Sequence, residues 1–262
     1  MRDVLRFEWV RLRTIRSTWW LIGSGLLLNT AVAMLLALAT RHEPLDARIV
    51  SDVVTAGGAS FPLPLLAVFL AVIGIFATGH DYRYHTIQPT LAAIPQRARL
   101  LVGKVIVVGG VAVLVTAGSV VLNIAAGLVW WDRFPDLTSP PLGEVLPGYL
   151  LLSLLWSVVG TALGQLFRGV PAPLVAILVV PLVVEQLVLR LSFVPSLDWL
   201  APAVKFLPFT AGQQLISYAG EASGGDATEV HMLARWPSAT VLAAFAAAAL
   251  AAALALFRHR DA

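Results

Sequence analysis

Residues 79–104 read GHDYRYHTIQPTLAAIPQRARLLVGK and form a long polar interruption between two apolar runs. Within this stretch, Ile87, Leu91 and Ile94 follow an i, i+4, i+7 pattern, which places them on one face of a helix. Pro95 is expected to end that helix, because the proline ring clashes with the preceding turn. The stretch therefore predicts a short amphipathic helix outside the bilayer, followed by a basic turn and a new membrane span. A helix of this kind can dock another molecule.

The composition of the whole chain is that of a membrane protein. Its 262 residues are 58% hydrophobic and 13% charged, whereas soluble domains carry about 25% charged residues. Long uncharged runs recur, and a membrane-spanning helix needs about 20 mostly apolar residues. The alternating polarity of barrel strands is absent. The sequence predicts an all-α polytopic protein with a single transmembrane domain and six spans, at residues 19–39, 61–78, 105–129, 147–167, 171–190 and 237–257.

The distribution of basic residues predicts the orientation in the membrane. Twelve of the 18 lysines and arginines lie on one side of the six-span arrangement, in the N-terminus, residues 79–104, Arg168 and the C-terminus. Because basic residues near span ends stay on the cytoplasmic side, both termini are predicted to be cytoplasmic in the cell membrane. Nucleic-acid binding is disfavoured, since the basic residues lie beside spans and do not form one patch.

The first 18 residues predict a helix at the membrane surface. Arg2, Arg6 and Arg13 fall in a narrow sector of a helical wheel, with Leu5 and Leu12 on a neighbouring face. We expect an interfacial connecting helix over residues 1–18, with apolar side chains in the headgroup layer and arginines toward anionic lipid. A plain positive-inside anchor is the alternative interpretation.

The segments predicted on the outer side differ in character. Residues 40–60 are expected to be a loop. Residues 191–236 are too long and too apolar in their first half for a simple loop, so they predict short helices that dip into the outer leaflet. Non-helical backbone at that depth must be covered by protein.

The fourth predicted span carries Gly160 and Gly164 in a small-x-x-x-small pattern. This pattern favours close approach of two membrane helices. It also arises by chance in apolar helices, so the packing partner stays open.

Glu185 is the only acid inside a predicted span. Burying a charge is costly unless it is paired. Glu185 could pair with Arg190 near the membrane surface, extend its carboxylate to the outer edge, or take part in substrate handling or gating.

Three stretches carry a resemblance to a known family. They are EWVRLRTIRSTWW at residues 8–20, DYRYHTI at residues 81–87 and LPFTAGQ at residues 207–213. In these stretches, and in its six-span architecture, the chain resembles the membrane permease subunits of type-2 ATP-binding-cassette exporters. His85 stands where such loops often have glycine, and Asp81 where they often have glutamate.

The resemblance implies a connecting helix before the first span, a cytoplasmic coupling helix in residues 79–104 and a re-entrant outer segment before the sixth span. It also implies two partners, a cytoplasmic ATPase subunit and a second permease subunit that is identical or different. The residues expected to couple the chain to the ATPase are Asp81, Arg83, Ile87, Leu91, Ile94 and Arg97, with the three aliphatic side chains as an apolar docking strip.

The expected cargo is an amphipathic or hydrophobic molecule, such as a drug, antibiotic, lipid or peptide, that moves outward between two subunits. Polar residues are sparse in the spans, which suits such a cargo. The residues expected to line its path are Asn29, Thr30, Thr116, Ser119, Asn123 and Glu185. The residues expected to form an outer lid are Leu207, Pro208, Phe209 and Gln213.

Motifs for catalysis are absent from the sequence. Gly103 and Lys104 are followed by Val105 and do not complete a phosphate-binding loop, so the chain is expected not to be an enzyme, and ATP and Mg would bind the partner. No serine-nucleophile motif is present, and His80, Asp81 and His85 match no standard metal-site spacing. The alternatives are a non-transporting membrane scaffold or immunity protein and a proton-coupled carrier, which would depend on Glu185.

Overall fold

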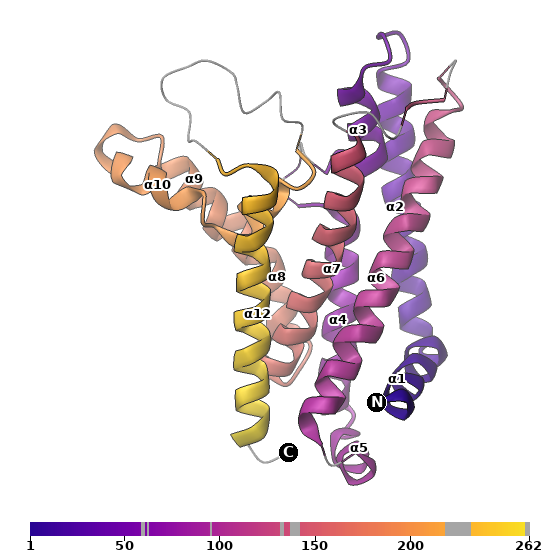
Figure 1. Cartoon of the computed structure of the whole chain (residues 1–262), viewed down its shortest axis with the longest axis vertical. Coiled ribbons are helices and arrows are strands. Elements are labelled where there is room, and N and C mark those ends of the chain that lie inside the picture. The colour runs from indigo at the N-terminus through magenta and orange to yellow at the C-terminus, as the bar shows by residue number, and fades with distance from the viewer. Residues whose placement is uncertain are drawn as a thin grey trace.

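The computed structural model describes residues 1–58, 61, 63–94, 96–131, 134–136, 142–217 and 232–259. Regular structure in these ranges is helical, without a strand. Six helices in this part of the chain are long and apolar enough to cross a membrane. The first helix begins and the last helix ends at the same end of the bundle (Figure 1). The protein is therefore an all-helical membrane protein, as its composition predicts.

The six spans overlap the six predicted segments. They are α2 (Arg16–Ala39), α4 (Leu65–Arg83), α6 (Arg97–Gly127), α7 (Leu142–Phe167), the run from α8 to α9 (Pro171–Leu191) and α12 (Arg235–His259). The second span begins at Leu65 and not at residue 61, because Pro64 occupies its N-cap position. The third begins at Arg97 and not at residue 105, because the basic turn is itself part of the helix.

The fifth span is interrupted by a π-helical segment. Pro181 lies within it and cannot donate a backbone hydrogen bond. The α-helix α8 (Pro171–Val179) widens into the π-helix η1 (Val180–Glu185) before continuing as α9 (Gln186–Leu191). Such insertions bend a helix and re-aim the side chains that follow. Here the inward-facing side chain at the end of η1 is Glu185, which is buried.

Helices α4 and α7 touch through their backbones. A Cβ atom at Gly160 would lie 2.7 Å from the carbonyl carbon of Ala71, and one at Gly164 would lie 2.9 Å from the carbonyl oxygen of Ile75. From the other side, a Cβ at Gly74 would lie 2.8 Å from the backbone nitrogen of Thr161. The small-x-x-x-small prediction is thus confirmed as a helix contact, and its partner is α4.

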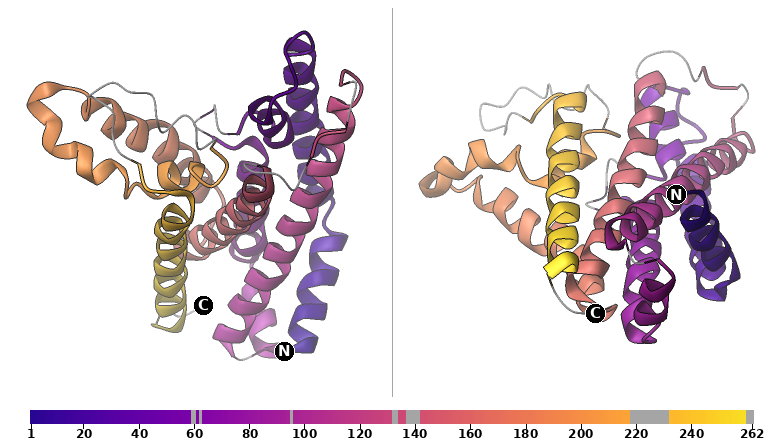
Figure 2. Two further views of the ribbon diagram at one scale, coloured as in Figure 1. Left: turned by 45° about the horizontal axis from the view of Figure 1, so that its top comes forward. Right: turned by 60° about the horizontal axis from the view of Figure 1, so that its bottom comes forward.

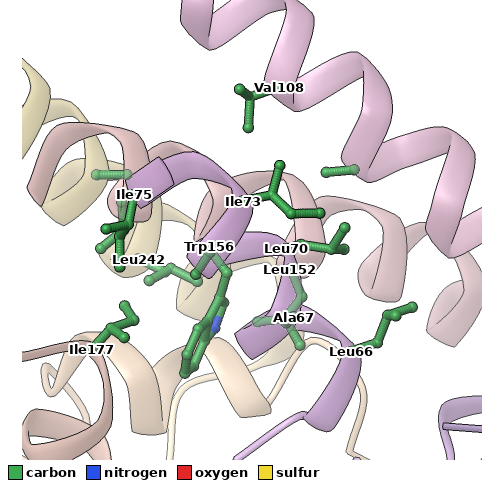
Figure 3. Close-up of a cluster of buried hydrophobic side chains, with 14 of the residues drawn as sticks. Leu66, Ala67, Leu70, Ile73, Ile75, Val108, Leu152, Trp156, Ile177 and Leu242 are labelled. Atoms are coloured by element: carbon green, nitrogen blue, oxygen red, sulfur yellow. The ribbon is translucent and has the colours of Figure 1, made fainter. Parts of the chain in front are cut away.

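A large apolar core surrounds the α4–α7 contact. Trp156 of α7 is fully buried at its centre. Figure 3 shows this ring among side chains from α4, α6, α7, α8 and α12. The labelled residues are Leu66, Ala67, Leu70, Ile73, Ile75, Val108, Leu152, Ile177 and Leu242. In a membrane, where lipid is as apolar as these side chains, close packing holds such helices together.

Shorter helices flank the bundle at both ends. At the end where the chain begins lie α1 (Arg2–Thr14) and α5 (Ile87–Ala93). At the other end lies α3 (Ala47–Thr55), within the predicted loop 40–60. Its formation follows from a local signal, since the Asp46 carboxylate accepts a hydrogen bond from the Ala47 nitrogen at 2.6 Å.

The segment between the fifth and sixth spans forms short helices, as predicted. They are η2 (Pro195–Leu200), α10 (Ala201–Val204) and α11 (Pro208–Gln213). Figures 1 and 2 show α9 and α10 diverging from the bundle at the end opposite α1. The chain then returns, so that α11 packs against α12 and the core. Residues 218–231 of the predicted outer segment, and the helix-ending Pro95, lie outside the described residues.

Candidate functional site

Four charged side chains form a buried cluster that joins α1 to the bases of α4 and α6. Glu8 and Arg11 come from α1, Asp81 from α4 and Lys104 from α6, and we call this cluster the charge quartet. The Lys104 Nζ lies 2.9 and 3.0 Å from the two carboxylate oxygens of Glu8 and 2.9 Å from Asp81 Oδ2. It also donates a hydrogen bond to the carbonyl of Ala77 at 3.0 Å.

The quartet balances its own charge. Arg11 Nη1 donates to Asp81 Oδ2 at 3.0 Å, and a second Arg11 nitrogen also contacts this carboxylate. Two acids therefore face two bases, while Glu8, Asp81 and Lys104 are each at most 2% exposed. Buried ions need such partners, because an unpaired charge away from water is strongly destabilising. Mutual pairing is what allows Glu8, Asp81 and Lys104 to be buried, while the Arg11 side chain is partly exposed.

Local sequence places Glu8 and Arg11 in the quartet. Helix α1 buries Val4, Glu8 and Leu12, which share one face at intervals of four residues. Glu8 therefore sits in the middle of an otherwise apolar inner face. An acid on an apolar helix face indicates that a buried cation lies nearby. The sequence analysis did not place Glu8 or Lys104 among the site residues, because their partners lie far away in the chain.

Asp81 also connects the quartet to the loop that follows α4. Thr86 Oγ1 donates to Asp81 Oδ1 at 3.1 Å, and the Thr86 nitrogen donates to the Asp81 carbonyl at 3.0 Å. Asp81 thus contacts α1, α6 and the residue that precedes α5. The sequence assigned Asp81 to coupling, and the structure places its side chain at this junction.

Helix α5 occurs where the sequence predicts it, but its aliphatic face points inward. Ile87 is buried, and Leu91 and Ile94 are partly buried against Leu100 of α6 and Phe257 of α12. The expected docking strip is therefore packed on the chain's own helices, because the ends of α6 and α12 offer apolar side chains to cover it. The outward surface of this loop includes instead the exposed residues Arg83, Tyr84, His85, Thr86, Gln88, Pro89 and Ala92.

The two arginines assigned to coupling have different environments. Arg97 is partly buried, and its Nη1 donates to the carbonyl of Phe257 at 2.6 Å while the guanidinium lies 5.6 Å from the Phe257 ring centre. Arg97 therefore ties the base of α6 to the end of α12. Arg83 is exposed beside the Tyr84 ring and remains at the surface of the loop.

His85 adopts a left-handed backbone conformation, with φ of 53°. This conformation is strained for most residues and free of strain for glycine. The turn after α4 is therefore formed with a histidine at a position whose backbone conformation favours glycine.

The second polar centre joins the fifth span to the re-entrant segment. The Glu185 carboxylate accepts hydrogen bonds from the backbone nitrogens of Phe209 and Thr210 at 3.0 and 2.6 Å. It also accepts one from Thr210 Oγ1 at 2.7 Å. The two backbone donors are N–H groups in the first turn of α11, where a carboxylate is favoured. Glu185 therefore binds α11 in preference to the Arg190 partner considered from the sequence.

The residues expected to form an outer lid lie around this contact. The Phe209 ring packs edge-on against Trp156 and Phe245, with ring centres 4.8 and 5.7 Å apart. Leu207 precedes α11 as its N-cap and Pro208 is its first residue. Gln213 Nε2 donates to the carbonyl of Phe61 at 3.0 Å. The structure thus groups Glu185, assigned from the sequence to the path, with the lid residues.

Replacing Glu185 with alanine is expected to release α11. The buried nitrogens of Phe209 and Thr210 would lose their acceptor, at a cost of about 1–3 kcal/mol for each unsatisfied group. Limited proteolysis and hydrogen exchange of residues 195–217 would report the release. Arg190→Ala is the matched control, and equal effects of the two substitutions would argue against the observed pairing.

The other expected path residues lie inside the protomer. Asn29 of α2 and Thr116, Ser119 and Asn123 of α6 are fully buried, and Thr30 is partly buried. The Tyr149 hydroxyl of α7 faces Ser119 and Asn29, and Asn123 Nδ2 donates to the carbonyl of Val54 at 2.8 Å. These side chains form an internal polar strip between α2, α6 and α7, so they do not line the protomer's outer surface.

No protein-family model matches the sequence, and no curated protein is significantly similar to it. The charge quartet and the Glu185 contact are the two polar centres that connect separate helices of the bundle, and the quartet also contacts the α5 loop.

Proposed function

We propose that the protein is the transmembrane permease subunit of an ATP-driven exporter and works with a separate ATPase subunit. The observation that carries this proposal is the charge quartet, because it connects α1, two spans and the α5 loop through one continuous set of ion pairs and hydrogen bonds. A force applied to the loop would reach α4 and α6 together. Breaking the quartet is costly, which suits a rigid connection.

The contacts of α5 extend this connection to a third span. Its inner face rests on Leu100 at the base of α6 and on Phe257 at the end of α12, and Arg97 holds those two helices together. Closure of an ATPase beneath the loop would therefore move α4, α6 and α12. Alternating access requires such rigid movement of helices around a central path.

In this proposal the end of the bundle that carries α1 and α5 faces the cytoplasm of the cell. The ATPase would bind ATP and Mg and would contact the outward surface of the loop at Tyr84, His85, Gln88, Pro89 and Ala92. The cargo is an amphipathic or hydrophobic molecule that moves outward. A second permease subunit would pack along α2 and the α8–α9 run, where large apolar side chains such as Leu27, Leu35, Val175 and Leu182 are exposed.

The environment of Glu185 weighs against a proton-coupled carrier. Such a carrier needs a titratable group that is free to exchange protons within the membrane. The Glu185 carboxylate is already occupied by three hydrogen bonds from α11. Its contacts fit a structural connection to the lid segment better than proton exchange.

Placing arginine at Ala92 is expected to separate the protein from its ATPase. Ala92 is exposed on the outward face of α5, so the change would leave the fold intact while inserting a charge into the proposed contact. We expect the amount of ATPase that co-purifies from native membranes to fall by about tenfold or more, since central interface positions often contribute about 2 kcal/mol. ATP hydrolysis by the purified complex provides the measurement.

Ala203→Arg is the matched control, because Ala203 is an exposed alanine of α10 near the opposite end. It should retain the ATPase. A wild-type protein that purifies from native membranes without ATP hydrolysis would support the scaffold alternative. An Ala92→Arg variant with full activity would place the contact elsewhere.

A further inference from the structure

The face of α1 that points away from the bundle combines positive charge with large apolar side chains. Helix α1 turns Val4, Glu8 and Leu12 inward. The exposed side chains on its remaining surface include one acid, Asp3, together with Arg2, Arg6, Phe7, Trp9, Val10 and Arg13. On a helical wheel the three arginines share one sector, with Trp9 on one side and Val10 and Phe7 on the other. We call this surface the arginine face.

The position of α1 sets the direction of the arginine face. Its inner side chains contact the flanks of two membrane spans, α6 and α4. Val4 packs on Gly103 and Glu8 pairs with Lys104, and both of these partners lie in α6. Leu12 belongs to the apolar core that contains the side chains of α4. A helix that rests against the side of a membrane bundle turns its opposite face toward the surrounding lipid. The arginine face therefore points laterally.

The connection to α2 sets the depth of the arginine face. A single residue, Ile15, separates α1 from the membrane-spanning helix α2. Near the start of α2, Trp19 is 57% exposed and donates to the Arg13 carbonyl at 2.8 Å, and Trp20 is 77% exposed. Exposed tryptophans at the start of a span are typical of the headgroup layer. Arg13 thus lies at the level of lipid headgroups.

We propose that the arginine face binds the headgroups of anionic phospholipids. The three guanidinium groups have no salt-bridge partner among the described residues, and guanidinium groups suit phosphate because they donate paired hydrogen bonds. Phe7, Trp9 and Val10 would enter the boundary with the acyl chains, as in other interfacial helices. The bound lipid would be linked to α4 and α6 through Glu8 and Arg11 of the same helix.

The side chains between the arginines favour lipid over an acidic protein. An acidic protein would complement the charge of the arginines. It would approach from water, however, and would leave Phe7, Trp9 and Val10 uncovered at the depth of the headgroups. A lipid layer supplies both chemistries at that depth. This inference does not depend on the proposed exporter function, because lipid retention can be measured without an ATPase.

The test uses the full chain in a neutral detergent mixed with phosphatidylcholine and phosphatidylglycerol. Native mass spectrometry would count the lipids that remain bound to each variant. Removing the charges with Arg2→Gln, Arg6→Gln and Arg13→Gln is expected to lower phosphatidylglycerol retention by about fivefold for each arginine, and added salt should weaken retention by the unchanged chain. Retention of phosphatidylcholine should change little.

Two companion variants make the result specific. Arg41→Gln, Arg48→Gln and Arg190→Gln remove three exposed arginines elsewhere on the chain and should leave phosphatidylglycerol retention nearly unchanged. Arg2→Lys, Arg6→Lys and Arg13→Lys keep the charge but lose the paired hydrogen bonds, so this variant should retain more phosphatidylglycerol than the glutamine variant and less than the unchanged chain.

Three results would overturn the proposal. They are unchanged phosphatidylglycerol retention in the glutamine variant of the arginine face, equal loss in the distant triple variant, and loss in the lysine variant as large as in the glutamine variant. If the glutamine variant kept its lipid but lost a co-purifying ATPase, an acidic protein would be the occupant. Failure of the exporter proposal alone would leave the lipid result standing.

Discussion

Lys104→Met is expected to lower the free energy of unfolding by about 3–5 kcal/mol, the largest effect we expect from a single polar change. Lys104 contacts both carboxylates of the quartet, and its removal would leave Glu8 without its closest cation and Asp81 with Arg11 alone. Both acids are buried, so water cannot replace the lost partner. Unfolding in mixed micelles containing a denaturing detergent would measure the loss.

A control and a rescue separate this explanation from a general effect of removing a lysine. Arg99→Met also removes a cation from the first turns of α6, but Arg99 is exposed and should change the stability little. Adding Glu8→Gln to Lys104→Met should restore part of the stability, because the buried charge would again balance. If the double variant were less stable than Lys104→Met, the pairing within the quartet would not be the source of the loss.

Gly160→Leu is expected to disrupt the contact between α4 and α7. A side chain at this position meets the backbone of Ala71, which cannot rotate away as a side chain could. Overpacking typically costs about 1–3 kcal/mol, and we expect the upper end of that range or more because helix separation would also expose the core around Trp156. The fraction of protein that remains folded after extraction, and its thermal unfolding, would measure the effect.

Gly118→Leu is the matched control for the helix contact. A Cβ at Gly118 meets no atom of the described chain within 4 Å, and Gly118 also lies inside a span, in α6. This variant should keep or slightly raise the stability, since leucine favours helices more than glycine. Similar losses for the two variants would mean that the close approach at Gly160 is not what makes leucine harmful there.

The sequence alone was sufficient for the features that depend on local patterns. The length and polarity of each apolar run predicted six spans, because a membrane core accepts only segments of that length whose backbone is internally bonded. Periodicity predicted the helix at Ile87, and the length and apolar character of residues 191–236 predicted short helices there. The spacing of Gly160 and Gly164 predicted a close helix contact without naming α4 as the partner.

Only the tertiary structure decided which faces meet. Glu8 and Lys104 are 96 positions apart, and nothing local to either residue indicates that α1 folds against the base of α6. Glu185 similarly found its partners in α11, where a turn of the chain brings free backbone N–H groups to it. The aliphatic face of α5 points inward because the apolar side chains of Leu100 and Phe257 pack against it. A local pattern reveals that a side chain needs a partner, but the identity of that partner depends on the packing of the whole bundle.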